Sequence, residues 1–204
     1  MEGVIFLDLE TTGLTETDEI IEIGAIKVNG KGERIYRQLI NPSVSHISPR
    51  IFKLCSGITE KDLRSSPGFD DIREAFLEFI SDFPLVCHNA AFEKRMLEKA
   101  LGHKLNNTLL DSLELFCIFK PHFTRHNLQY LLQHYLKENW PEGHRALADA
   151  RGTMKLVGNL FADLAEKDYD LLEETLQNMH DTEWSWLPYL REAAPATLKQ
   201  VTVT

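Results

Sequence analysis

The sequence lacks any apolar run long enough to cross a bilayer. A membrane-spanning helix needs roughly 20 consecutive apolar residues, and every apolar stretch in this chain is much shorter. Glu2 and Asp8 interrupt the first apolar run, which argues against a secretory signal. We therefore expect a cytoplasmic globular protein with no membrane partner, in keeping with its 43% hydrophobic and 26% charged residues.

Cysteine is also scarce. Cys55, Cys87 and Cys117 are odd in number and lack the spacing of a metal-binding motif. Such usage is typical of a reducing compartment. It predicts three free thiols that act as packing residues.

Basic residues are few relative to acidic ones. The chain has 22 lysines and arginines against 31 acids, which gives a formal charge of −9. This balance argues against a broad basic surface that holds long nucleic acid. It leaves room for a protein that grips a few nucleotides through metal ions, backbone amides and a local basic rim. No glycine-rich P-loop occurs, so the chain itself is not an ATPase.

The order of expected elements indicates an α/β fold. Residues 4–9, 20–28 and 34–40 have the composition of three consecutive strands joined as a meander, and residues 84–87 and 108–110 look like short strands. Helical spacing or short helical turns are found at residues 51–54, 60–63, 69–82, 94–100, 111–119, 127–137, 146–164 and 171–179. A meander followed by alternating helices and strands predicts a mixed five-stranded sheet with helices on both faces.

The last 40 residues differ from the rest. We expect one domain over residues 1–165 and a C-terminal helical extension and tail over residues 166–204. The aromatic residues around Trp184 and Trp186 are apolar enough to dock on that domain. The segment after Ala193 has the composition of a linker, so the chain either ends in a frayed tail or continues in a longer protein.

Two acids stand at the end of the first expected strand. Side chains two apart on a strand share a face, so Asp8 and Glu10 project the same way. Paired carboxylates at the end of a buried strand repel each other and lose hydration, and a divalent cation would compensate for both. The alternative is that both acids are solvated and one caps a turn.

Three further residues join this pair as candidates. Asp149 lies among apolar residues at the start of a helix, and His144 lies five residues earlier, on the preceding loop. Glu93 follows the fourth strand. Alternatively, His144 is an exposed loop histidine, Asp149 stabilises a helix dipole, and Glu93 is a surface helix residue.

Together these residues fit a two-metal phosphoryl-transfer site. Such a site uses several carboxylates to hold two divalent ions roughly 4 Å apart, one to activate water and one to stabilise the leaving oxygen. It also needs a base that accepts a proton near neutral pH, for which histidine has a suitable pKa. Two Mg²⁺ or Mn²⁺ ions suit the oxygen ligands better than Zn²⁺.

Three motifs carry a family resemblance. The segments Phe-Leu-Asp-Leu-Glu-Thr-Thr-Gly (6–13), His-Asn-Ala-Ala-Phe-Glu (88–93) and His-Arg-Ala-Leu-Ala-Asp-Ala (144–150) resemble those of the DEDDh, DnaQ-like 3′–5′ exonucleases, in the family's order. The resemblance covers about residues 1–165. It implies a ribonuclease H-like fold and two-metal hydrolysis of the 3′-terminal phosphodiester, with release of nucleoside 5′-monophosphates.

The resemblance also implies roles for individual residues. Asp8, Glu10, Glu93 and Asp149 would be metal ligands, with Asp8 bridging both ions, and His144 would be the general base. The residues that the resemblance places around the terminal nucleotide are Leu9, Thr11, Thr12, Gly57, Ile58, Asn89 and Phe92. Glu93 departs from the family, which normally has Asp here. The carboxylate lies one methylene farther out, so a weaker second metal, slower turnover or an inactive domain are all compatible with the sequence.

The expected substrate is a nucleic acid with a free 3′ end, with single-stranded DNA favoured. An RNA-trimming exonuclease of the same fold is the nearest alternative, because sequence does not show whether a protein contacts the 2′-OH. A second alternative is a weakly active or inactive module attached to a replication or repair partner. Residues 110–115 and the tryptophan-containing tail resemble exonuclease domains fused to DinG-type helicases, so a polymerase or helicase partner or fused domain is expected.

A basic segment precedes the helix that starts near Asn127. Lys120, His122, Arg125 and His126 could contact the nucleic-acid backbone or form a solvated loop.

Overall fold

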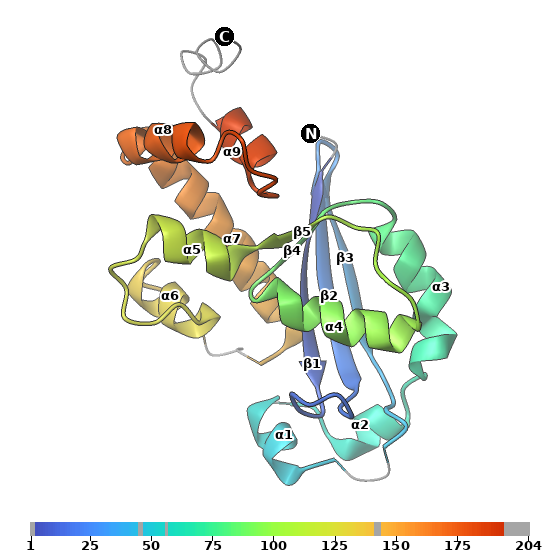
Figure 1. Cartoon of the computed structure of the whole chain (residues 1–204). Helices are drawn as coiled ribbons and strands as arrows, with labels where there is room; N and C mark the ends of the chain where they lie inside the picture. Colours follow the sequence, from blue (N-terminus) through green and yellow to red (C-terminus); the bar gives the residue numbers. More distant parts are fainter. Residues whose placement is uncertain (1–2, 45–46, 56, 141–143, 194–204) are drawn as a thin grey trace.

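A mixed sheet in the strand order β3-β2-β1-β4-β5 lies at the centre of the molecule (Figure 1). The strands β1 (Val4–Thr11), β2 (Ile20–Asn29) and β3 (Gly32–Leu39) form an antiparallel meander. The short strands β4 (Leu85–Cys87) and β5 (Leu109–Asp111) run parallel to β1 on its other side. The expected five-stranded mixed sheet, with its meander first, is confirmed.

The computed structural model describes residues 3–44, 47–55, 57–140 and 144–193. Its helices are α1 (Pro49–Leu54), α2 (Glu60–Arg64), α3 (Phe69–Ile80), α4 (Ala90–Leu101), α5 (Ser112–Phe119), α6 (Leu128–His134), α7 (Ala146–Glu166), α8 (Tyr169–Asn178) and α9 (Leu187–Ala193). Asn127 caps α6 by accepting the Tyr130 N–H. That helix ends at His134 rather than near residue 137, where Lys137 has a φ of 61°. None of the described helices is long and apolar enough to span a membrane.

Helices cover both faces of the sheet, as expected. On one face α3 and α4 pack against Ile5, Leu7 and Leu9 of β1. On the other face α5, α6 and α7 form a second core with Phe6. Because side chains alternate along a strand, Asp8 and Glu10 lie on the same face as Phe6, just beyond the apolar core.

The first turn of α7 lies directly on β2. A Cβ atom added to Gly24 would lie 2.1 Å from Leu147 N and 2.2 Å from the carbonyl carbon of Ala146. Gly24 is the partner of Asp8 in the β1–β2 register. The absence of a side chain at Gly24 therefore brings the helix that carries Asp149 next to the strand that carries Asp8 and Glu10.

The C-terminal extension packs on the second core. Trp186, which is 2% exposed, and Leu190 belong to the same hydrophobic cluster as Phe6. The Trp186 indole donates a hydrogen bond to the Asp111 carbonyl at 2.9 Å. The placement of a domain boundary at residue 165 remains a prediction, and residues 194–204 lie outside the described part.

The cysteines divide into two groups. Cys55 and Cys87 are buried and Cys117 is exposed, and all three are free thiols. The expectation of free thiols is confirmed. The expectation that all three are packing residues is wrong for Cys117, because its position on α5 faces solvent.

Candidate active site

The acid pair of β1 lies at the edge of an open cavity. Asp8 and Glu10 are two residues apart on the strand, and the cavity of ≈ 630 Å³ includes both in its lining. Glu10 lies opposite Glu22 of β2, after which a bulge shifts the register. The interpretation of two freely solvated acids past the end of the strand is wrong, because both belong to the paired part of β1.

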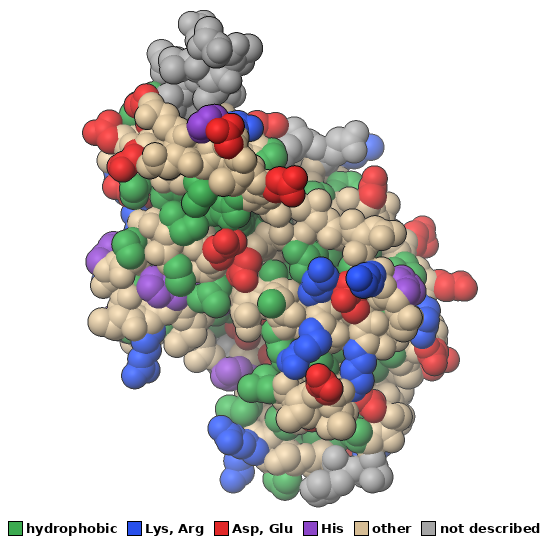
Figure 2. Space-filling model, viewed as in Figure 1, with side chains coloured by type: hydrophobic (Ala, Val, Ile, Leu, Met, Phe, Trp, Pro, Cys, Tyr) green, Lys and Arg blue, Asp and Glu red, His purple; other side chains and the backbone are tan. Residues whose placement is uncertain are grey.

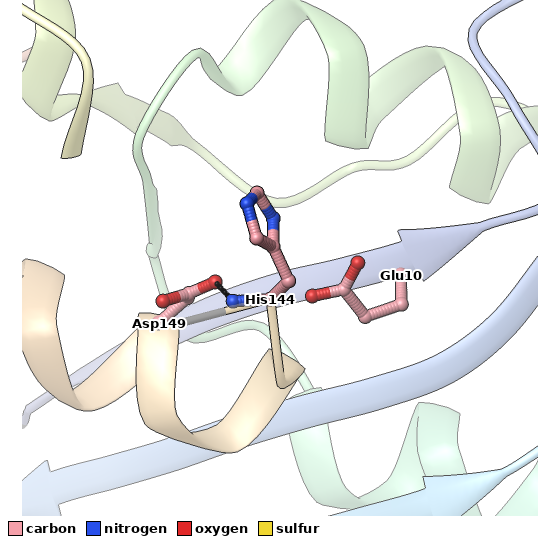
Figure 3. Close-up of side chains that lie close together, drawn as sticks. All are labelled: Glu10, His144 and Asp149. Atoms are coloured by element: carbon pink, nitrogen blue, oxygen red, sulfur yellow. Dashed lines mark hydrogen bonds between the residues drawn. The ribbon is translucent and has the colours of Figure 1, made fainter. Parts of the chain in front are cut away.

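The start of α7 brings two more candidates to the same place. His144 precedes the helix with a φ of 63°, a left-handed conformation, and its side chain is exposed. Its backbone N–H donates to Asp149 Oδ2 at 2.8 Å (Figure 3). One potential ligand atom each from Glu10, His144 and Asp149 lies within 4.8 Å of the other two. The sequence candidates from positions 10, 144 and 149 therefore converge.

Glu93 lies in the first turn of α4. It is 4% exposed, and its Oε2 has no hydrogen-bond partner in the described part of the chain. Burial raises the pKa of this carboxyl to about 8, and the neighbouring Asp111 adds to the shift. The alternative of a surface helix residue is wrong for Glu93.

Burial and mutual repulsion dominate the electrostatics of the site. Burial, followed by the charge of Asp149 and then of Glu93, raises the pKa of Asp8 well above its usual range. Burial raises the pKa of Glu10 to about 7, although the Cys55 thiol donates to Glu10 Oε2 at 3.3 Å and opposes the rise. Desolvation likewise raises the pKa of Asp149. Each carboxylate carries its charge at a cost that a bound cation would remove.

The predicted nucleotide-binding residues fall into two groups. Leu9 and Asn89 line the cavity. Asn89 is the N-cap of α4 with a φ of 91°, and its N–H donates to Asp111. The cavity lining drawn from the described residues does not include Thr11, Thr12, Gly57, Ile58, Phe92 or Glu93.

The predicted nucleotide-binding residues that do not line the cavity contact other parts of the protein or lie in exposed backbone. The hydroxyl of Thr11 donates to the Gly13 carbonyl, and that of Thr12 donates to Asp18. Ile58 is buried in a small cluster beneath α1 and α2. Gly57 is exposed with a φ of 80°. The Phe92 ring centroid lies 5.5 Å from the Arg95 guanidinium carbon. Roles for these residues in nucleotide binding remain predictions.

Sequence reasoning missed Glu22, which lies next to the site. Its carboxylate is fully buried and accepts hydrogen bonds from Arg37 Nε at 3.0 Å and from Arg145 Nε and Nη2 at 3.1 and 3.0 Å. The Ala146 N–H donates to it at 3.2 Å. Glu22 therefore joins β2 to β3 and to the start of α7. A lone acid within Ile-Ile-Glu-Ile was the available signal.

Sequence patterns also did not single out His88 or the residues of the opposite cavity wall. The His88 Nε2 donates to the His126 carbonyl at 2.7 Å, and its Nδ1 lies 2.9 Å from the Ser112 hydroxyl. Burial lowers the pKa of His88, and the Ser112 hydroxyl in turn donates to the Cys87 carbonyl at 3.1 Å. The rest of the wall comprises Leu113 and residues 126–129. No local pattern marks these residues, because only the tertiary fold brings them to the cavity.

The basic segment before α6 is only partly available to a ligand. Lys120 is 9% exposed, and its Nζ contacts Asp168 Oδ2 at 2.5 Å. Because the Lys120 ammonium already pairs with the Asp168 carboxylate of the C-terminal extension, its suggested contact with a nucleic-acid backbone is wrong. His122 and Arg125 are exposed.

Comparison with known proteins adds independent information. A model of an exonuclease family matches residues 5–157. The DNA polymerase III PolC-type protein of Bacillus subtilis (strain 168) is 36% identical over 186 residues, which cover 87% of this chain and 13% of that protein. The PolC-type protein of Caldanaerobacter subterraneus is 36% identical over 170 residues, covering 81% and 12%. The chain thus spans about an eighth of the length of these relatives.

Solved structures resemble the chain as well. Exonuclease X in complex with 5′ overhanging duplex DNA aligns with a TM-score of 0.63 at 25% identity, over 78% of this chain and 91% of that chain. The nuclease domain of 3′hExo, a DEDDh family member bound to rAMP, aligns with a TM-score of 0.68 at 15% identity, over 79% and 92%. The second likeness shows a shared fold.

Proposed function

The chain belongs to the DnaQ-like, DEDDh family of 3′–5′ exonucleases, and from this premise we propose that it hydrolyses the terminal phosphodiester of DNA with two divalent ions and a histidine base. The products would be nucleoside 5′-monophosphates. The observation that carries the proposal is the convergence of Asp8, Glu10 and Asp149 on one cavity with the buried Glu93 beside them.

The residues fit divalent metal ions. Among the described residues, none of these four acids forms an ion pair with a lysine or arginine, and Glu93 Oε2 lacks any hydrogen-bond partner. Buried carboxylates without a partner are costly. Hard cations such as Mg²⁺ and Mn²⁺ prefer oxygen ligands. Asp8, Glu10, Glu93 and Asp149 would therefore hold the ions.

The ions would polarise the scissile phosphate and lower the pKa of the attacking water. His144 would accept the proton of that water. Figure 3 draws its ring between the Asp149 and Glu10 side chains, on a loop that is tied to Asp149 through the backbone N–H of His144. Because its side chain is exposed at the cavity, it can exchange the proton with solvent after each cycle.

Leu9 and Asn89, which line the cavity, would contact the terminal nucleotide. The cavity of ≈ 630 Å³ lies within the range of small-molecule sites. Thr11, Thr12, Gly57, Ile58 and Phe92, which the family resemblance places around the terminal nucleotide, would contact the substrate outside this lining.

DNA is the favoured substrate. The relatives that cover most of the chain are named DNA polymerases, and the Exonuclease X structure holds duplex DNA. By the same reasoning, a polymerase would be a partner or a fused domain, with replication or repair as the context. The helicase alternative has less support among these relatives, and the cytoplasmic location remains a prediction.

The test is a nuclease assay on matched single-stranded DNA and RNA labelled at the 5′ end or the 3′ end. With Mg²⁺ or Mn²⁺, we expect mononucleotide release from 3′ ends of DNA and none after addition of EDTA. Internal cleavage or release from 5′ ends would refute the assigned polarity. Faster hydrolysis of RNA would replace DNA with RNA as the substrate, and metal binding without hydrolysis would favour the inactive module.

A further inference from the structure

Trp140 lies in the segment between α6 and α7, and its indole packs on α7 beside Asp149. The indole Nε1 donates to Asp149 Oδ1 at 3.2 Å. A Cβ atom added to Gly152 would lie 2.9 Å from Leu132 Cδ1 and 3.4 Å from the ring, so the ring packs within van der Waals distance of this position. The Nζ of Lys155 lies 5.3 Å from the ring centroid. Positions 149, 152 and 155 share one helix face, and together they hold the indole in place.

The Asp149 carboxylate accepts hydrogen bonds from two residues that precede α7, Trp140 and His144. Its Oδ1 accepts the Trp140 indole N–H, and its Oδ2 accepts the His144 backbone N–H at 2.8 Å. Each carboxylate oxygen has two lone pairs, so each retains one after these bonds form. The carboxylate can thus serve as a metal ligand without releasing either residue.

We propose that Trp140 is a positioning residue, whose N–H orients the Asp149 carboxylate for a divalent ion and links the placement of His144 to that ion. This inference rests on the proposed function. A hydrogen-bond donor behind a metal-binding carboxylate fixes its rotation, so less conformational freedom is lost when the ion binds. Because Trp140 already donates to Asp149 and stacks under the Lys155 ammonium, it provides this orientation before the ion arrives.

The decisive variant is Trp140→Phe, which keeps an aromatic ring and removes the N–H. Loss of a hydrogen bond behind a metal ligand typically weakens metal affinity by about 10-fold or more. We therefore expect Mn²⁺ binding, measured by isothermal titration calorimetry, to weaken by at least about 10-fold. Trp184→Phe is the matched control, because the Trp184 indole N–H has no partner among the described residues. Equal Mn²⁺ affinity in the two variants would overturn the inference.

A second measurement uses the intrinsic fluorescence of Trp140. Trp184→Phe retains Trp140 and Trp186, and we expect Mg²⁺ to change its tryptophan emission as the ion binds Asp149. Asp149→Ala in the same background should abolish the change. An Mg²⁺-insensitive emission in Trp184→Phe, despite metal binding by calorimetry, would overturn the inference. This arm decides the question even when Trp140→Phe does not fold.

The outcomes separate this inference from the proposed function. A wild-type chain that binds no Mn²⁺ and releases no nucleotides would remove the proposed function itself. A wild-type chain that binds Mn²⁺ and degrades DNA, together with a Trp140→Phe variant of unchanged affinity, would remove only the role of Trp140. A structural role alone would lower the thermal stability of Trp140→Phe and leave its Mn²⁺ affinity at the wild-type value.

Discussion

Glu10 and Glu22 face each other across β1 and β2, yet their surroundings differ completely. Glu22 is fully buried and has two arginines and a backbone N–H as partners. Within the described part of the chain, Glu10 accepts a hydrogen bond only from the weak Cys55 thiol, and burial raises its pKa to about 7. The chain supplies arginine and backbone partners for the Glu22 carboxylate and no ion-pair partner for Glu10 among the described residues. Two acids of the same type, paired across two strands, thus have very different surroundings.

The charged surface reflects the same division. Figure 2 shows basic side chains over α4 and near α1, to either side of the hollow that contains a histidine, with acids both among them and over the rest of the visible face. Among the residues of α4, Lys94 and Arg95 are exposed. A local basic rim around an acidic site is compatible with nucleic-acid binding by a chain of net charge −9.

The largest expected effect comes from removing Asp8, whose carboxylate has no hydrogen-bond or ion-pair partner among the described residues. Asp8→Ala should reduce nuclease activity on the order of 10³-fold or more, because ion-mediated charge stabilisation is worth several kcal/mol. Its circular dichroism should match that of the wild type, since the change relieves repulsion among buried acids. Glu78→Ala on the exposed face of α3 is the control. Full activity in Asp8→Ala would exclude Asp8 as a metal ligand.

Removing Glu22, whose carboxylate has arginine partners, should lower the stability of the fold instead. Glu22→Ala leaves the partly buried Arg145 without its carboxylate, and breaking such a pair costs about 3 kcal/mol or more of unfolding free energy. Urea denaturation would measure the loss. Glu33→Ala breaks an exposed pair with Arg151 and should cost less than about 1 kcal/mol. Equal losses in these two variants would contradict the distinct role of Glu22.

The pH dependence of stability provides a third test. Glu10 and Glu93 have folded-state pKa values of about 7 and about 8, both above the ordinary value of 4.5. The folded state therefore binds more protons than the unfolded state between pH 4.5 and 8. In EDTA, stability should fall as pH rises through this window.

Thermal unfolding with EDTA and with saturating Mg²⁺ would measure this dependence. Mg²⁺ should flatten the decline, because it stabilises the ionised carboxylates. A metal-free stability that rises steadily from pH 5 to 8 would mean that these carboxyls have other partners.

The smallest expected effect concerns the length of one side chain. Glu93→Asp restores the residue normally found in the family and keeps the charge, so activity should be equal to or greater than that of the wild type. Steady-state hydrolysis of a 3′-labelled oligonucleotide would measure it, with Glu93→Gln as the charge-removing comparison. A large loss in Glu93→Asp would show that the site is built around the longer side chain.

Local patterns predicted the fold and the centre of the site. Alternation along β1 placed Asp8 and Glu10 on one face, and the glycine before His144 indicated a loop ahead of α7. The long-range contacts could not be predicted in this way. Glu22 meets Arg145 from a position 123 residues away, and the burial of Lys120 depends on Asp168 in the C-terminal extension. Neither partner is visible until the sheet and α7 are assembled.

The bare backbone at Gly24 has a consequence for how this molecule could move. Because the peptide group between Ala146 and Leu147 rests on the strand with no side chain between them, no rotamer change can widen that junction. A displacement of Asp149 relative to Asp8 would require the whole of α7 to shift as a rigid body, together with the side chains of the second core that pack on it. The main chain therefore sets the separation between Asp8 and Asp149, and even a single added methyl group at Gly24 would push the strand and the helix that carry them apart.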